Sequence, residues 1–206
     1  KPNLLILSGL HGDEAAIIDG VKKSIYTYLN QLPPFLFIPE ASPSAVRQKT
    51  RVNKDQIDIN RQFFEQTKID EIKIIMQIIK QYYFDLAVCF HEDLQQTKFY
   101  LYDSKGYKKI QNLKPFKKEI KTKGLLLFNG IDDANDPNLG HKIYNGYCSL
   151  SNLNNKPQNG TFDSWALRQN IVKRILTPEI PGRINIKTKY QIIDAFFRHL
   201  IIREAT

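Results

Sequence analysis

The sequence predicts an α/β fold with a mixed, mostly parallel central sheet flanked by helices on both faces. Short, continuously apolar runs, such as Asn3–Ser8 and Asp85–Phe90, are typical of strands buried on both sides. Apolar residues at helical spacing follow or precede these runs in Ala15–Leu29 and Ile69–Tyr83. Strands that alternate with helices along a chain indicate parallel pairing, because each helix carries the chain back across the sheet.

The other predicted elements continue this alternation. Further strands are expected at Phe35–Ile38, Lys98–Tyr102, Gly124–Phe128 and Arg174–Leu176, and further helices at Gly106–Lys123, Phe162–Asn170 and Lys187–Arg203. The stretch from Pro39 to Arg61 is polar without a clear period, which predicts a long loop. Long loops inside compact domains are usually functional or disordered.

The composition predicts one soluble domain over residues 1–206. The chain has 206 residues, of which 42% are hydrophobic and 25% charged, as in ordinary globular proteins. Its apolar runs are too short to span a bilayer, and the chain opens on a core strand rather than a visible signal peptide. We therefore expect no membrane span and a cytoplasmic location, and we expect free thiols at Cys89 and Cys148. The oligomeric state stays open.

The formal net charge of +9 raises the question of nucleic-acid binding. The densest lysine cluster lies in Lys105–Lys123, but no recognition helix, aromatic RNA platform or zinc finger accompanies it. The cluster is interpreted as a solvated basic face, with attraction of an anionic substrate or polymer as the alternative. No specific nucleic-acid partner is expected.

Four chemically capable residues follow predicted strands. His11 and Glu14 follow the first strand, His91 the third and Glu179 a late one. Because ligands bind at the carboxyl ends of strands in open α/β sheets, these side chains are expected to converge. Two imidazoles and a carboxylate suit one zinc ion with a position left for water, and a spare carboxylate can move the proton.

The two remaining histidines and the long loop carry weaker signals. His141 lies in a polar stretch and His199 beside core positions, so both are expected to be structural or solvated. In the loop, the fork of Arg61 beside Asn60 could hold a substrate carboxylate, while Arg51 could polarise a scissile carbonyl.

These motifs together resemble the M14 zinc metallocarboxypeptidases. They are Gly9-Leu10-His11-Gly12-Asp13-Glu14, Asp58-Ile59-Asn60-Arg61-Gln62-Phe63, His91-Glu92-Asp93 and Thr177-Pro178-Glu179-Ile180-Pro181, in that family's order. The third and fourth motifs look nearest to the small bacterial members, including murein peptide amidases. The succinylglutamate desuccinylase and aspartoacylase branch shares the same zinc ligands.

The resemblance implies a zinc carboxypeptidase-like fold with a mixed eight-stranded sheet. It also implies a single Zn²⁺ held by His11, Glu14 and His91. Glu179 would act as general base and then acid. Asn60 and Arg61 would grip the terminal carboxylate, and Arg51 (with Arg47 nearby in the same loop) would stabilise the oxyanion. The implied substrate is a small peptide, such as a peptidoglycan-derived one.

The chain departs from the family at one functional position. The family's mobile tyrosine is expected about twenty residues before the catalytic glutamate, where this chain reads Asn154-Asn155-Lys156-Pro157, and Tyr144 or Tyr147 are the candidate replacements. Two alternatives to a carboxypeptidase stay open. One is an N-acyl-amino-acid deacylase with the same metal site. The other is a non-catalytic module that binds through its basic surface.

Overall fold

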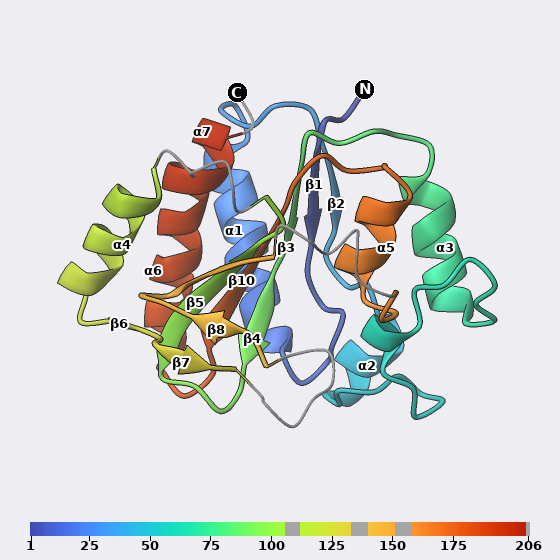
Figure 1. Cartoon of the computed structure of the whole chain (residues 1–206), viewed down its shortest axis with the longest axis horizontal. Coiled ribbons are helices and arrows are strands. Elements are labelled where there is room, and N and C mark those ends of the chain that lie inside the picture. Colours follow the sequence, from blue (N-terminus) through green and yellow to red (C-terminus); the bar gives the residue numbers. More distant parts are fainter. Residues whose placement is uncertain (106–111, 133–139, 151–157, 205–206) are drawn as a thin grey trace.

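A central sheet with helices on both faces forms the molecule, whose structure is a computed structural model describing residues 1–105, 112–132, 140–150 and 158–204 (Figure 1). The strands are β1 (Leu4–Leu7), β2 (Phe35–Ile38), β3 (Leu86–Cys89), β4 (His91–Asp93), β5 (Lys98–Asp103), β6 (Leu126–Leu127), β7 (Gly130–Ile131), β8 (Lys142–Ile143), β9 (Tyr147–Ser149) and β10 (Ile175–Pro181). The main helices are α1 (Ile18–Tyr28), α2 (Pro43–Gln48), α3 (Asp70–Ile79), α4 (Leu113–Thr122), α5 (Phe162–Arg168) and α6 (Ile186–Phe196).

The sheet of the described residues has eight strands, and its main path runs β2-β1-β3-β10-β5-β6. Neighbouring strands from β2 to β10 pair in parallel, whereas β10 and β5 pair antiparallel. β4 pairs in parallel with β10, and β6 and β9 both pair in parallel with β5. The predicted mixed, mostly parallel sheet is therefore confirmed. β7 and β8 form a separate antiparallel pair.

Alternate residues of β1 pack into two separate hydrophobic layers, one on each face of the sheet. Leu4 and Ile6 pack in the cluster that contains the buried faces of α1, α4 and α6. Leu5 and Leu7 pack in the cluster that contains those of α3 and α5. Figure 1 shows these two sets of helices on opposite sides of the sheet. Because both faces of the strand are covered, each of these side chains contributes about 1.5–3 kcal/mol of burial free energy.

Several boundaries differ from the sequence-based expectations. The stretch expected to be one long loop contains α2 and a 3₁₀ turn, η2 (Ile59–Arg61). The closing helix passes from α6 through one π-helical segment, η4 (Phe197–Ile201), into α7 (Ile202–Glu204), and Phe197, Leu200 and Ile201 remain buried. Residues 106–111 of the helix expected at Gly106–Lys123 lie outside the described residues, and α4 covers the rest.

The strand expected at Arg174–Leu176 is longer than predicted, because β10 continues to Pro181. Glu179 therefore lies within a strand rather than after one. His91 follows the third strand, β3, as predicted, and is also the first residue of β4. A search of the described helices finds none with the length and apolar character needed to cross a membrane.

Candidate metal centre

His11 and Glu14 lie in the turn that leaves β1, and two glycines shape this turn. Gly9 has a φ of +66°, a conformation that favours glycine. At Gly12 the turn packs so tightly on α2 that a Cβ atom would lie 1.9 Å from the carbonyl oxygen of Ala45. No side chain fits there. The glycines thus allow the backbone to place both functional side chains at the end of the strand.

His91 reaches the same place from the neighbouring strand. Leu7, the last residue of β1, is in register with Cys89, the last residue of β3, so the two strands end side by side. After the single residue Phe90 the chain resumes as β4, where His91 is in register with Glu179 of β10. Three segments that are far apart in the sequence therefore bring their functional side chains together.

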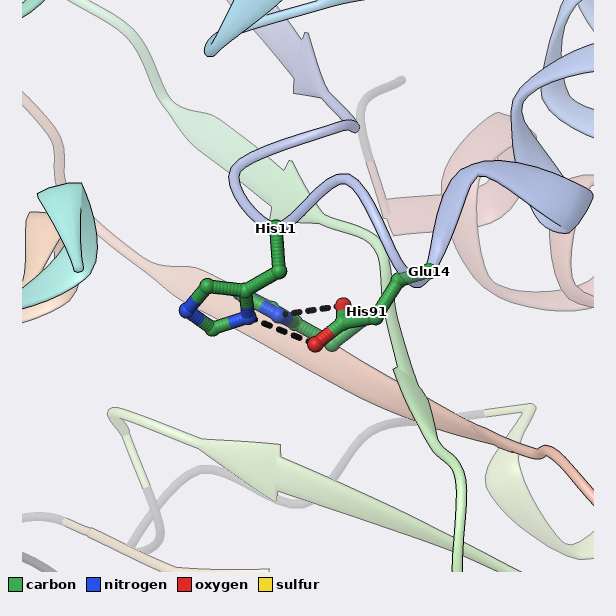
Figure 2. Close-up of side chains that lie close together, drawn as sticks. All are labelled: His11, Glu14 and His91. Atoms are coloured by element: carbon green, nitrogen blue, oxygen red, sulfur yellow. Dashed lines mark hydrogen bonds and ion pairs between the residues drawn. The ribbon is translucent and has the colours of Figure 1, made fainter. Parts of the chain in front are cut away.

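The side chains of His11, Glu14 and His91 form a compact, buried group (Figure 2). One potential ligand atom from each lies within 4.8 Å of the others. The Nδ1 atoms of the two imidazoles approach the two carboxylate oxygens of Glu14, at 2.5 Å for His11 and 2.9 Å for His91. Two nitrogens and a carboxylate that converge in this way fit a zinc ion with one open position.

The far sides of the two imidazoles are held by other groups. Nε2 of His11 lies 3.0 Å from Oδ1 of Asp58, and Nε2 of His91 lies 3.5 Å from Sγ of Cys89. The backbone N–H of Glu92 donates to Glu14 at 3.1 Å. Partners of this kind fix the orientation and tautomer of metal-binding histidines. Sequence reasoning did not assign this role to Asp58 or Cys89, although Asp58 opens one of the motifs that it singled out.

Electrostatics in this group favour positive charge beside Glu14. Burial opposes the charged form of Glu14, but His91 and His11 outweigh it and hold the pKa of the carboxyl well below its usual range. Burial also opposes protonation of His91, yet Glu14 raises the pKa of this imidazole well above its usual value. A carboxylate that attracts charge onto two imidazoles would attract a divalent cation for the same reason.

Glu179 lines the same cavity as the three candidate ligands. Burial raises the pKa of its carboxyl to about 8, and Glu14 and Asp93 add to this shift while His91 and His11 oppose it. A carboxyl beside a cluster of histidines can gain and lose a proton near neutral pH.

The cavity has a volume of about 520 Å³, and Arg51, Asn60 and Arg61 also line it. Arg51 is held through Asp58, whose Oδ2 lies 3.1 Å from Nε and 3.0 Å from Nη2 of the arginine. Oδ1 of Asn60 accepts a hydrogen bond of 2.9 Å from the backbone N–H of Phe162, the first residue of α5. This hydrogen bond orients the side-chain amide of Asn60. Arg61 donates through Nη1 to the Asn60 carbonyl at 3.0 Å. The predicted metal ligands, Glu179, Arg51, Asn60 and Arg61 thus border one cavity, whereas Arg47 is not among its lining residues.

The cavity contains tyrosines that sequence reasoning missed. Tyr100 and Tyr102 line it, and their hydroxyls donate to Asp93 and Asp132 respectively. Two residues apart in β5, they share one face of the strand, which is the alternation that could have revealed them. The expected replacements behave differently. Tyr144 and Tyr147 are not among the cavity's lining residues, and the hydroxyl of Tyr147 donates to Asp103 at 2.6 Å.

The two histidines outside the metal group have different surroundings. His199 is structural, as expected, with Nε2 2.8 Å from a carboxylate oxygen of Glu119. His141, expected to be structural or solvated, is half-buried and lines the cavity. Half-buried Asp163 lines it too and accepts a hydrogen bond of 2.7 Å from Thr177. His141 lies in a polar stretch and Asp163 in a short predicted helix, and neither belongs to a motif that could have indicated a place in the cavity. Asn154–Pro157, where the family's tyrosine is expected, lies outside the described residues.

Comparison with solved structures relates this arrangement to known folds, although no protein-family profile and no curated protein sequence matches the chain. A metallo-carboxypeptidase from Burkholderia cenocepacia superimposes with a TM-score of 0.66 over 99% of this chain and 57% of that one, at 13% identity. The chain has a carboxypeptidase-like fold. The mixed eight-stranded sheet implied by the family resemblance is therefore confirmed.

Two further structures show the range of similar proteins. A candidate metallopeptidase from Shewanella baltica OS155 is 18% identical, with a TM-score of 0.78 over 100% of this chain and 77% of that one. A succinylglutamate desuccinylase from Silicibacter sp. TM1040 is 17% identical, with a TM-score of 0.57 over 98% of this chain and 57% of that one. At these identities the likeness establishes the fold, and the chain spans 57% of the carboxypeptidase and of the desuccinylase.

Proposed function

We propose that the protein is a zinc-dependent hydrolase that cleaves the amide bond next to a terminal, carboxylate-bearing residue. The observation that carries this proposal is the convergence of His11, Glu14 and His91, beside Glu179, in one cavity. The two imidazoles and the carboxylate would hold a single Zn²⁺. When bound, zinc would supply a Lewis acid and bring the pKa of a water molecule toward neutrality.

The chain's own residues account for the remaining steps. Glu179 takes a proton from the attacking water and passes it to the leaving amine, which departs as the carbonyl–nitrogen bond breaks. Asn60 and Arg61 hold the terminal carboxylate of the substrate, because the arginine fork matches carboxylate geometry. Arg51 stabilises the negative charge that develops on the carbonyl oxygen. We propose small peptides, including peptidoglycan-derived ones, as substrates.

A second candidate is an N-acyl-amino-acid deacylase that uses the same metal group. The fold similarity to a succinylglutamate desuccinylase supports this alternative. The two activities differ in the acyl side of the scissile bond, which is a peptide in one case and a small acid in the other. Side-by-side assays with short peptides and N-acyl amino acids, on the same zinc-loaded preparation, separate them.

The general-base role is tested with the variant Glu179→Gln. It keeps the size of the side chain but cannot accept the proton, so we expect turnover to fall by about 10²–10⁴-fold with unchanged zinc content. Glu40→Gln, which alters a half-exposed carboxylate on the surface, is the matched control and should keep full activity. Turnover in Glu179→Gln within about two-fold of the unaltered protein would contradict the assignment. Loss of zinc in that variant would show instead a role in assembling the centre.

A further inference from the structure

A group of lysines on α4 surrounds an open hollow away from the candidate metal centre. The hollow has a volume of about 510 Å³, and its lining is Lys114, Lys117, Lys118, Lys121, Thr122 and Asn145. We call this surface the basic hollow. In Figure 1, α4 lies at the outer edge of the helix layer that covers one face of the sheet. Four cations thus share one concave surface.

None of these four lysines forms an ion pair within the part of the chain that the structure describes. By contrast, Lys123, the residue directly after α4, lies 2.6 Å from Glu119. Lys117 is half-buried with its ammonium 5.6 Å from the centre of the Tyr147 ring. Burial, followed by the charge of Lys121, lowers the pKa of Lys117 to about 8. Among the described residues, the positive charge of the basic hollow therefore has no carboxylate partner, and an anion would stabilise it.

We propose that the basic hollow binds an acidic peptide segment. Its cations are all lysines, and its described lining residues include no arginine. Nucleic-acid sites typically use arginine forks for phosphates and open aromatic faces on which bases stack. Here the nearby Tyr147 ring already has the Lys117 ammonium over its face. The carboxylate side chains of an extended acidic peptide can each be bound by a single lysine ammonium, provided that the lysines lie at matching intervals. The chemistry of the hollow therefore favours a polycarboxylate over a polynucleotide.

β8 and β9 are joined by a tight turn across which the backbones of Tyr144 and Tyr147 exchange hydrogen bonds of 3.0 and 3.1 Å. This β8–β9 hairpin connects the basic hollow with the cavity at the candidate metal centre. Asn145, at the turn of this hairpin, lines the hollow, whereas His141 and Leu150, at its two ends, line the cavity. Four residues of extended chain separate His141 from Asn145, a span of roughly 13 Å. A peptide whose end lies in the cavity can therefore reach the hollow with residues a few positions upstream. The assignment of the acidic segment to a substrate rests on the proposed function. The binding of an acidic peptide to the basic hollow does not depend on that function.

The test measures binding of a fluorescein-labelled octaglutamate to the full chain by fluorescence anisotropy, with chelator present so that hydrolysis plays no part. We expect saturable binding that weakens as salt is added, since exposed charges are screened. The double variant Lys114→Gln/Lys121→Gln, at two exposed positions, should bind about tenfold more weakly. Lys23→Gln/Lys68→Gln removes the same charge at exposed positions elsewhere and should bind as the unaltered protein does.

The proposal would be overturned by no saturable binding of octaglutamate or by equal weakening in both double variants. It would also be overturned by at least tenfold tighter binding of an eight-nucleotide single-stranded DNA at the same salt concentration. Lys117→Gln provides an independent check, because it removes the half-buried cation without touching the exposed ones. Unaltered binding in this variant and in Lys114→Gln/Lys121→Gln would likewise exclude the hollow. Failure of the proposed hydrolase activity would leave these binding results unaffected, so the two failures are distinguishable.

Discussion

Two glutamates of this chain each pair with histidine, yet their surroundings make them different kinds of site. Glu14 lies between His11 and His91, and its side chain is 7% exposed. Glu119 receives hydrogen bonds from both Nη atoms of Arg198, at 3.1 and 2.6 Å, as well as lying 2.8 Å from His199, and its side chain is 23% exposed. Both are glutamates with nitrogen-bearing side chains on two sides.

The chemistry of the partners separates a candidate metal centre from an ion-pair network. The partners of Glu14 are imidazoles, which can give up a proton and offer a lone pair to a metal. The main partner of Glu119 is a guanidinium, which stays protonated and has no lone pair to offer. A glutamate beside histidine is therefore no signal by itself. The signal is a group whose members can all become ligands at once.

The largest effect expected from this comparison is loss of metal in His91→Gln. Zinc content measured by plasma mass spectrometry should fall from about one ion per chain to near zero, because two ligands do not make a closed site. Zinc at 100 times its Kd should raise the free energy of unfolding of the unaltered protein by about 2.7 kcal/mol. The same zinc concentration should leave the free energy of unfolding of His91→Gln unchanged. The matched variant His199→Gln should keep both its zinc and this stabilisation. Retention of zinc by His91→Gln would remove the distinction between the two groups.

The next effect concerns the partner behind His11. In Asp58→Asn the imidazole loses the carboxylate that orients it, so zinc affinity should fall by about 10–100-fold in a competition titration with a chromophoric chelator. Asp58 also holds Arg51, and Arg51→Gln is therefore the control. Zinc affinity should be unchanged in this control. If both variants lose affinity equally, the arginine rather than the carboxylate supports the centre.

The ion pairs and hydrogen bonds around Glu119 should make the stability of the protein depend on pH under acidic conditions. Hydrogen bonds from Arg198, with those from Lys123 and His199, hold the pKa of Glu119 below its ordinary value of 4.5. A lowered pKa in the folded state contributes stability above pH 4.5 that is lost as the pH falls below it. Urea unfolding between about pH 6 and pH 3 should therefore show a shallower decline in Glu119→Gln than in the unaltered protein. Parallel curves would exclude this linkage.

The smallest expected effect lies at the edge of the same network. Lys123→Gln removes one ion pair between residues four apart on the surface of α4, and its cost should be about 0.3–0.5 kcal/mol in urea unfolding at neutral pH. Zinc content should stay at its original value. A cost above about 2 kcal/mol would mean that the network is cooperative rather than a sum of surface pairs.

The candidate ligands could be predicted because their positions follow from the sheet. Buried parallel strands have continuous apolar sequences, so the ends of β1 and β3 were visible, and parallel strands end at the same edge. His11 and His91 needed no further information to be placed together. The helices with strong apolar stripes, such as α3, were predicted for the same reason.

The parts that escaped prediction depend on contacts distant in the sequence. Strands of two or three residues, such as β7 and β8, are too short for a periodic pattern. A strand through Pro178 contradicts local propensity, and only its pairing with β4 and β5 explains it. The contact of Asp58 with His11 spans 47 residues and joins a loop to a turn, so neither periodicity nor spacing could have indicated it.

The absence of a side chain at Gly12 has a consequence for engineering this chain. Its backbone N–H donates to the carbonyl of Thr50 at 2.9 Å, and its α-carbon lies against Ala45, so the first and last parts of the segment 43–50 are clamped to the turn that carries His11. Surface segments usually tolerate inserted residues. This one should not, because added length would shift the imidazole of His11 away from Glu14 and His91. Loop grafts intended to change specificity therefore belong elsewhere, for instance in the β8–β9 hairpin.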